Sequence, residues 1–284
     1  MAFLSRNVHY QGPVKLSSFR KVALGTWQIE GDPSVYSEME FECEAALDYI
    51  DKVSAISGKK ITLTHFVGKA CAETIKRHPE LNCTLRWRKL YRRSDVDIFF
   101  QVASDTKGED LSGTTVRQID RKNILEIADD MQKKVKRIRD TGDVDYKEMK
   151  NTMRMIPAWA SRYLINFSSF MMYTLNVWSP LLGVPKDPFG SIMITSLGSI
   201  GLERAFVPLV PYSRIPCLVA IGSLREAPRV DNSQVVVRKV ISLCVTFDHR
   251  VIDGMHASHM VKTMKKIFAN PEAELGFPGS SSVS

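Results

Sequence analysis

The feature that most constrains the fold is a strand-like segment that leads into a helix-like one near the C-terminal end. Over residues 241–247, Ile, Leu, Val and Phe alternate with Ser, Cys and Thr. A period of two is typical of a β-strand whose two faces meet different surroundings. Over residues 257–268 the apolar residues recur with helical spacing, and Pro271 ends that segment. Residues 248–254 are therefore predicted to form a loop between the strand and the helix.

Strand and helix patterns also alternate along the rest of the chain. Strands are predicted over residues 36–42, 85–91, 96–102, 192–195, 218–221 and 235–247, and helices over 45–56, 66–77 and 121–139. The pattern does not decide between one strand and two within residues 85–91, or within residues 235–247. Gly58 is predicted to be the C-cap of the first helix and Thr64 the N-cap of the second. The simplest assignment is one α/β domain over residues 1–278, with a disordered tail at 279–284.

The composition limits the class of partner and the compartment. The chain of 284 residues carries a formal net charge of +8, with basic groups over residues 86–93 and 133–139 that we interpret as solvated faces. This charge suits an anionic partner, but the sequence has no nucleic-acid-binding motif, so nucleic acid is excluded. The five cysteines form no CxxC pair and no zinc-ligand pattern, so no metal is expected. Because no signal-peptide pattern occurs, a cytoplasmic protein is predicted.

Residues 155–185 are unusually apolar. No charged residue occurs from Tyr163 to Val184, a stretch long enough to cross a bilayer. Asn166, Asn176 and Pro180 interrupt it, which favours a pair of buried helices. The alternatives are an element that contacts a membrane or lipid and a true transmembrane helix.

The loop at 248–254 carries the residues best suited to chemistry. His249 follows an apolar strand, Asp253 lies four residues later, and Gly254 allows a sharp backbone turn. Loops at strand ends commonly present catalytic groups, and a partly desolvated neutral imidazole is suited to general-base work near neutral pH. A structural histidine gives the same pattern, so the loop alone leaves both interpretations open.

Residues 247–254 read Phe-Asp-His-Arg-Val-Ile-Asp-Gly. This segment resembles the signature of the dihydrolipoamide acyltransferase catalytic domain of 2-oxo acid dehydrogenase complexes, a domain that belongs with chloramphenicol acetyltransferase. Further segments resemble the family in the same order, at residues 17–23, 61–70, 79–82, 97–128 and 194–201. The resemblance implies an α/β fold like that of chloramphenicol acetyltransferase, with a mixed β-sheet flanked by helices in a trimer-forming subunit.

The resemblance also implies roles for individual residues. His249 would be the general base that takes a proton from the acceptor or from the coenzyme A thiol, so direct attack on the acyl carbonyl needs no covalent acyl-enzyme. The oxyanion donor would be Thr195, where the family usually has serine, or Ser196 if the register differs by one residue. Asp253 would form a structural ion pair with Arg20. We interpret four other histidines as structural or exposed, namely His65, His78, His256 and His259.

The family's active site lies between the subunits of a trimer. The resemblance therefore implies a homotrimer or a larger shell that uses coenzyme A or acyl-CoA as substrate and contains no metal. The acyl acceptor would be a free or protein-bound lipoyl group or another small molecule. The chain has no lipoyl-bearing lysine hairpin and no Ala/Pro-rich linker, so we expect no covalent lipoyl group on it and predict a stand-alone enzyme.

Two other functions fit the sequence. A non-catalytic oligomeric scaffold of the same fold is favoured by threonine at position 195 and opposed by the intact histidine motif. A membrane-associated acyltransferase of lipid or natural-product assembly would contact the membrane through residues 155–185. If the chain is an acyltransferase, we expect this apolar segment to line or cover a site for a larger or more apolar acyl chain.

Overall fold

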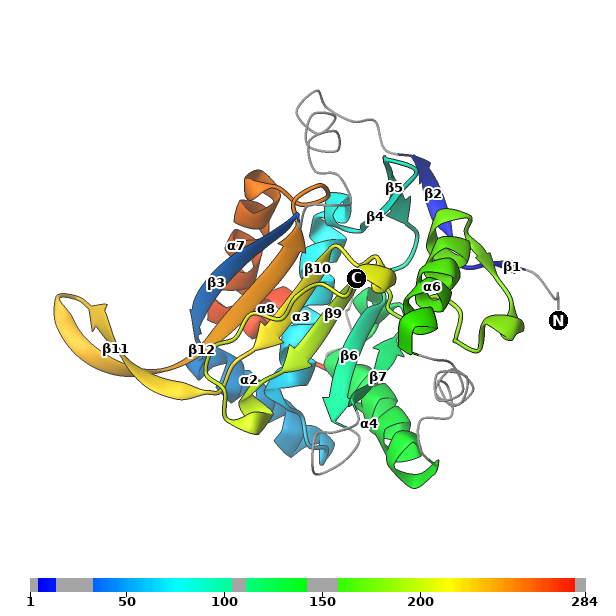
Figure 1. Ribbon diagram of the computed structural model, residues 1–284. Coiled ribbons are helices and arrows are strands. Elements are labelled where there is room, and N and C mark those ends of the chain that lie inside the picture. Colours follow the sequence, from blue (N-terminus) through cyan, green and yellow to red (C-terminus); the bar gives the residue numbers. More distant parts are fainter. Residues whose placement is uncertain (1–4, 14–32, 104–110, 142–157, 279–284) are drawn as a thin grey trace.

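The computed structural model describes residues 5–13, 33–103, 111–141 and 158–278. Within them, a central mixed β-sheet is flanked by helices, and two small sheets lie at one end (Figure 1). The strands are β1 (Ser5–Arg6), β2 (Tyr10–Pro13), β3 (Ser34–Glu42), β4 (Cys83–Arg86), β5 (Lys89–Arg93), β6 (Ile98–Ala103), β7 (Leu111–Val116), β8 (Val177–Trp178), β9 (Ile192–Ser196), β10 (Cys217–Ile221), β11 (Arg225–Asp231) and β12 (Gln234–Asp248). The α-helices are α2 (Glu44–Ser57), α3 (Leu63–Arg77), α4 (Ile124–Thr141), α6 (Ala158–Ser169), α7 (Gly254–Ala269) and α8 (Pro271–Leu275).

The central sheet has seven strands in the order β11-β12-β10-β9-β6-β7, and β3 pairs with the second half of β12. The neighbours β10 and β9, and β9 and β6, are parallel, whereas the other pairs are antiparallel. The predicted mixed β-sheet of an α/β fold is therefore confirmed. The assignment of a single domain stays a prediction, and the tail at 279–284 lies outside the described residues.

The two faces of the central sheet are buried in different ways. On one face, α2, α3, α4 and α7 pack against apolar strand residues such as Ile194 and Leu243, both fully buried. Helix α3 comes very close to the sheet, since a Cβ on Gly68 would lie 2.6 Å from the ring of Phe100. The other face carries a smaller cluster that includes Met193, covered by residues 205–210 and by the segment after α6.

Several predicted boundaries need correction. Gly58 is the left-handed C-cap of α2, as predicted, but α3 is capped by Thr62 rather than Thr64. The side chain of Thr62 accepts a hydrogen bond from the main-chain nitrogen of His65, whose ring accepts one in return. Residues 85–91 form a hairpin, and residues 235–247 belong to one strand. Strands β1, β2, β7, β8 and β11 are not among the predicted strands.

The apolar segment at 155–185 differs most from expectation. Its described part forms α6, the π-helical turn η4 (Phe170–Thr174), β8 and the 3₁₀ turn η5 (Pro180–Leu182). The prediction of a pair of helices is therefore wrong for the described residues. Met172 and Tyr173 are buried, whereas Tyr163 is 70% exposed and Phe167 58% exposed in the single chain. Burial of this segment within an assembly stays a prediction. Among the helices that the structure describes, none is long and apolar enough to span a membrane.

The cysteines and one arginine of the basic group at 86–93 are buried. All five cysteines are buried, and burial raises the pKa of Cys43 and of Cys71 to about 12, which keeps these thiols protonated and unreactive. Within the basic group at 86–93, Arg93 is buried and forms an ion pair with Asp187. The interpretation of that group as a solvated face is therefore wrong for Arg93.

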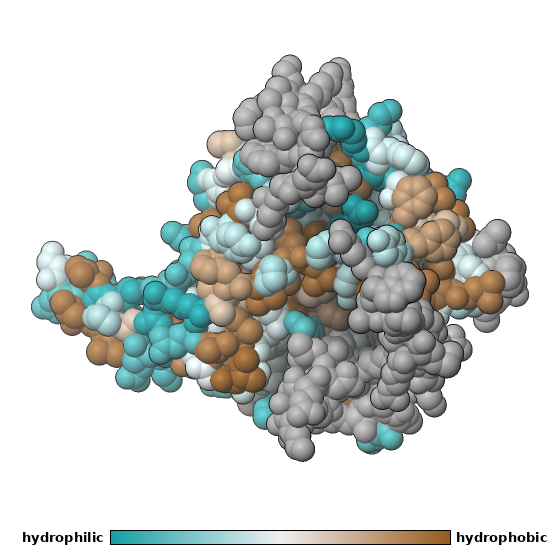
Figure 2. Space-filling model, viewed as in Figure 1, coloured by the Kyte–Doolittle hydropathy of each residue, from teal (hydrophilic) through white to brown (hydrophobic). Residues whose placement is uncertain are grey.

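A long hairpin made of β11 and the first half of β12 projects from the sheet (Figure 1). Apolar side chains lie among charged ones on this arm (Figure 2). Val230 is 77% exposed, Val235 75% and Val237 68%. Exposed valines on a projecting hairpin are typical of a surface that another chain covers.

Candidate active site

The loop that follows β12 is a tight, hydrogen-bonded turn. The main-chain nitrogens of Val251 and Ile252 both donate to the carbonyl of Asp248 at 2.9 Å. The guanidinium of Arg250 donates to both carboxylate oxygens of Asp248, with Nε at 3.0 Å from Oδ1 and a terminal nitrogen at 2.7 Å from Oδ2. Because Asp248 is only 8% exposed, this pair is shielded from water and holds the turn in one shape.

His249 lies within this turn and is held at two points. Its main-chain nitrogen donates to the carbonyl of Pro33 at 2.9 Å, which joins the turn to the start of β3. Its ring nitrogen Nδ1 lies 3.2 Å from the carbonyl oxygen of Ile252. A carbonyl only accepts hydrogen bonds, so Nδ1 carries the proton and Nε2 has the lone pair. The predicted base thus has a defined tautomer.

Asp253 begins α7 as its N-cap. Its carboxylate accepts a hydrogen bond from the main-chain nitrogen of His256 at 3.0 Å, and the ring of His256 accepts one from the nitrogen of Asp253 at 3.3 Å. This capping box ties the motif to the helix and gives Asp253 a structural role. The predicted partner Arg20 lies outside the described residues, so the ion pair stays a prediction.

Gly254 is the first residue of α7, and its backbone is not in the left-handed region. A Cβ on Gly254 would meet no atom within 4 Å. The expectation that this glycine permits a sharp turn is therefore wrong for the chain alone, because the turn closes before it, between Asp248 and Ile252.

The predicted oxyanion donor lies at the other end of the sheet. Thr195 pairs with Ala220, and Ala220 pairs with Cys244 on β12. His249 follows Cys244 by five residues, and a strand rises about 3.3 Å per residue, so about 16 Å separates the base from Thr195 along the strands. The chain therefore does not bring the two groups to one reacting carbonyl.

The alternation of β9 separates the two candidate hydroxyls. Thr195 shares a face with Met193 in the smaller apolar cluster and is 8% exposed, whereas Ser196 points to the opposite face and is partly exposed. The turn after Ser196 includes Gly201, whose φ of 79° is left-handed. A substrate on one face of the sheet could therefore contact only one of the two hydroxyls.

Two groups near His249 were not predicted. The Ile252 carbonyl orients the ring, and a main-chain acceptor has no signature in residue type. Arg214 lies close to the Asp248–Arg250 pair. Burial lowers the pKa of Arg214, and the positive charge of Arg250 lowers it further. Its position after a 3₁₀ turn, η7 (Pro211–Ser213), could be found only from the fold.

Comparison with known proteins places the chain in a family. The model of the 2-oxoacid dehydrogenases acyltransferase catalytic domain matches residues 14–157 and 188–275. A dihydrolipoyllysine-residue acetyltransferase component of the pyruvate dehydrogenase complex from Staphylococcus epidermidis is 25% identical over 224 residues, which are 78% of this chain and 41% of that protein. The chain thus spans less than half the length of this relative.

Solved structures show the same fold. The cubic core of a pyruvate dehydrogenase multienzyme complex is 20% identical, with a TM-score of 0.65 over 93% of this chain and 95% of that one. The dihydrolipoamide acetyltransferase of Azotobacter vinelandii, investigated for the catalytic roles of a serine, a histidine and an asparagine, is 19% identical, with a TM-score of 0.63 over 93% and 95%. The chain therefore belongs to the family of 2-oxoacid dehydrogenase acyltransferase catalytic domains.

Proposed function

We propose that the chain is a coenzyme A-dependent acyltransferase that moves an acyl group between an acyl-CoA thioester and a thiol or hydroxyl acceptor, with His249 as general base. The observation that carries this proposal is the geometry of the His249 ring. Its Nδ1 faces the Ile252 carbonyl, which assigns the lone pair to Nε2. With Nδ1 as the donor to this carbonyl, Nε2 is the ring nitrogen that would take a proton as general base.

The proposed reaction is a direct transfer. Nε2 of His249 takes the proton of the acceptor thiol, and the sulfur attacks the acyl carbonyl carbon. The tetrahedral oxyanion accepts a hydrogen bond from the hydroxyl of Thr195 or Ser196. As the intermediate collapses, the bond to the coenzyme A sulfur breaks and His249 returns its proton to that sulfur. Holding both substrates together supplies much of the rate enhancement without an acyl-enzyme.

We propose further that the catalytic unit is an assembly of identical chains. The base and the predicted oxyanion donor lie at opposite ends of one sheet, and one of the related proteins forms a cubic core. The exposed valines of the β11–β12 hairpin favour contact with another copy. A homotrimer or a larger shell would complete each site from two neighbours. The relatives act on dihydrolipoyl groups, so dihydrolipoamide is the first acceptor to test.

The test is acyl transfer by His249→Ala. Purified chain is incubated with dihydrolipoamide and a panel of acyl-CoA thioesters of increasing length, and the S-acyl product is measured by mass spectrometry. Loss of a general base lowers kcat by about 100- to 10,000-fold. The panel also determines which acyl chain the enzyme prefers.

A control variant separates catalysis from folding. His9→Ala removes an exposed histidine from the loop between β1 and β2, which belong to the two small sheets and not to the central sheet, and we expect full activity. Sedimentation checks that both variants keep the assembly. If the parent chain transfers no acyl group while assembling normally, the proposal is wrong and the non-catalytic scaffold takes its place. If His249→Ala remains fully active, the role of the base is wrong.

A further inference from the structure

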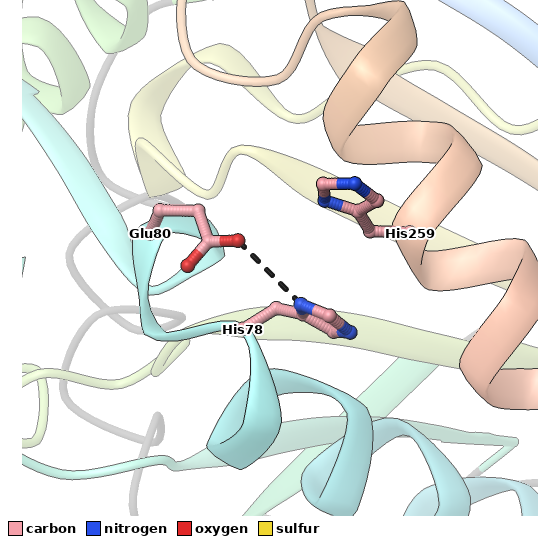
Figure 3. Close-up of side chains that lie close together, drawn as sticks. All are labelled: His78, Glu80 and His259. Atoms are coloured by element: carbon pink, nitrogen blue, oxygen red, sulfur yellow. Dashed lines mark ion pairs between the residues drawn. The ribbon is translucent and has the colours of Figure 1, made fainter.

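Three side chains that the acyl-transfer proposal does not use converge beside α7 (Figure 3). His78 is the C-cap of α3, Glu80 lies in the 3₁₀ turn η1 (Pro79–Leu81), and His259 comes from α7. Their ligand atoms all lie within 4.8 Å of one another. Figure 3 shows Glu80 directed at the His78 ring, with a nitrogen of His259 facing the same gap.

The His78 ring is already set for a ligand on one nitrogen. Its Nε2 lies 2.8 Å from the hydroxyl of Thr263, which is 8% exposed, and its Nδ1 lies 3.6 Å from a carboxylate oxygen of Glu80. If Nε2 donates to Thr263, the lone pair of Nδ1 points at the gap. Donation from the second ring nitrogen to a neighbouring oxygen is how metal-binding histidines are commonly oriented.

The backbone also helps to bring the three side chains together. Pro79 separates His78 from Glu80, and its ring fixes one dihedral angle of the short link between the two ligands. The rings of His78 and His259 are stacked, with centroids 5.5 Å apart and planes at 21°. Both imidazoles therefore border the gap that the Glu80 carboxylate also faces.

We propose that His78, Glu80 and His259 bind a divalent transition-metal ion, with Zn²⁺ as the preferred cation. Two imidazole nitrogens and one carboxylate suit Zn²⁺, Cu²⁺ or Ni²⁺, and they suit Mg²⁺ or Ca²⁺ poorly because those ions prefer oxygen. Ligand atoms around a tetrahedral zinc lie about 3.3 Å apart, so small rotations of Glu80 and His259 close the site. Water completes the coordination. Thr263 positions the His78 ring.

Metal binding here links the end of α3 to α7, the helix that begins directly after the His249 turn. The ion binds the folded chain, in which three ligands from distant parts of the sequence meet, and not the unfolded chain. Its binding free energy therefore adds to stability. This site is independent of the acyl-transfer proposal and stands or falls on metal binding alone.

The experiment is a titration of the metal-free full chain with Zn²⁺ by calorimetry and with Co²⁺ by visible absorption. We expect one equivalent to bind, and a thermal midpoint that rises with Zn²⁺. Cobalt should give no thiolate charge-transfer band, because the cysteines are buried. His78→Ala and His259→Ala should weaken binding by at least about 100-fold, and Thr263→Val by about 10- to 100-fold. His9→Ala should bind like the parent chain.

Glu80→Gln keeps the size of the side chain and serves if an alanine variant fails to fold. It should weaken Zn²⁺ binding while leaving the thermal midpoint of the metal-free chain unchanged. Unaltered affinity in the His78, Glu80 and His259 variants overturns the proposal. So does a cobalt spectrum with a thiolate band, or the absence of stoichiometric binding by the parent chain.

Discussion

At the scale of single residues, the orientation of His249 comes from the main chain. The motif identified His249 as the candidate base, since a histidine after an apolar strand stands out in the sequence. Its orienting partner could not be predicted, because the Ile252 carbonyl is present whatever residue occupies that position. Asp253, the acid four residues after His249, instead caps α7. Residue type thus indicated the reactive group but not what holds it.

The choice between Thr195 and Ser196 also belongs to this scale. We expect Thr195→Val to lower kcat by about 100- to 1,000-fold, because valine keeps the shape and removes the hydroxyl donor. Thr195→Ser should keep most of the activity, since it keeps the donor. Ser196→Ala should change kcat less than tenfold, because Ser196 faces the other side of the sheet. Steady-state kinetics with saturating substrates measures all three, and a large loss in Ser196→Ala alone would assign the donor to Ser196 instead.

At the scale of elements, the buried strands and the amphipathic helices were predictable, whereas the edge strands β7 and β11 were not. Strands β9 and β10 are nearly all apolar because both of their faces are buried. Strand β7 reads Leu-Ser-Gly-Thr-Thr-Val and β11 contains Pro228, so neither has a strong strand pattern. Each lies at an edge of the sheet and forms because a neighbour supplies hydrogen bonds. The local sequence of such a strand does not reveal which strand will pair with it.

The N-terminus of α3 gives a pH-dependent prediction. Burial lowers the pKa of His65 to about 4, while an unfolded histidine titrates near about 6.5. Between these values only the unfolded chain binds the proton, so the free energy of unfolding falls as the pH falls, by about 3 kcal/mol from this residue by pH 4. His65→Gln keeps a Thr-x-x-Gln capping box and cannot titrate. Its stability should therefore depend less on pH from 6.5 to 4.

Urea unfolding at several pH values measures this effect. Thr62→Ala is the matched control, because it removes the cap but leaves the titrating ring. It should cost about 1 kcal/mol. Parallel stability curves for the parent chain and His65→Gln over this range would show that His65 is not the group responsible.

At the scale of the whole molecule, the fold separates the two groups that the proposed reaction needs. Strand register puts Thr195 and His249 at opposite ends of the sheet, so in the proposed mechanism each chain presents half of a site at either end. The sequence resemblance implied such a division. The structure supplies its geometric reason, namely the antiparallel pairing of β10 with β12.

Mixed assemblies test the division directly. His249→Ala and Thr195→Val chains are each nearly inactive in the proposed mechanism. If they are unfolded, mixed in equal amounts and refolded together, three quarters of random trimers contain both kinds, and each of these has one intact site of three. Activity should recover to about a quarter of the parent value. Mixing without refolding is the control, and no recovery in well-formed mixed trimers would contradict a shared site.

Strand β12 has a consequence for how such sequences can change in length. One continuous strand pairs with β11 in its first half and with β3 in its second, and it ends at the His249 turn. Removing one residue from the second half would turn every later side chain to the opposite face and displace the base. Two residues removed from each side of the hairpin tip would only shorten the arm. Natural insertions and deletions should therefore gather at residues 231–234 and avoid residues 240–248.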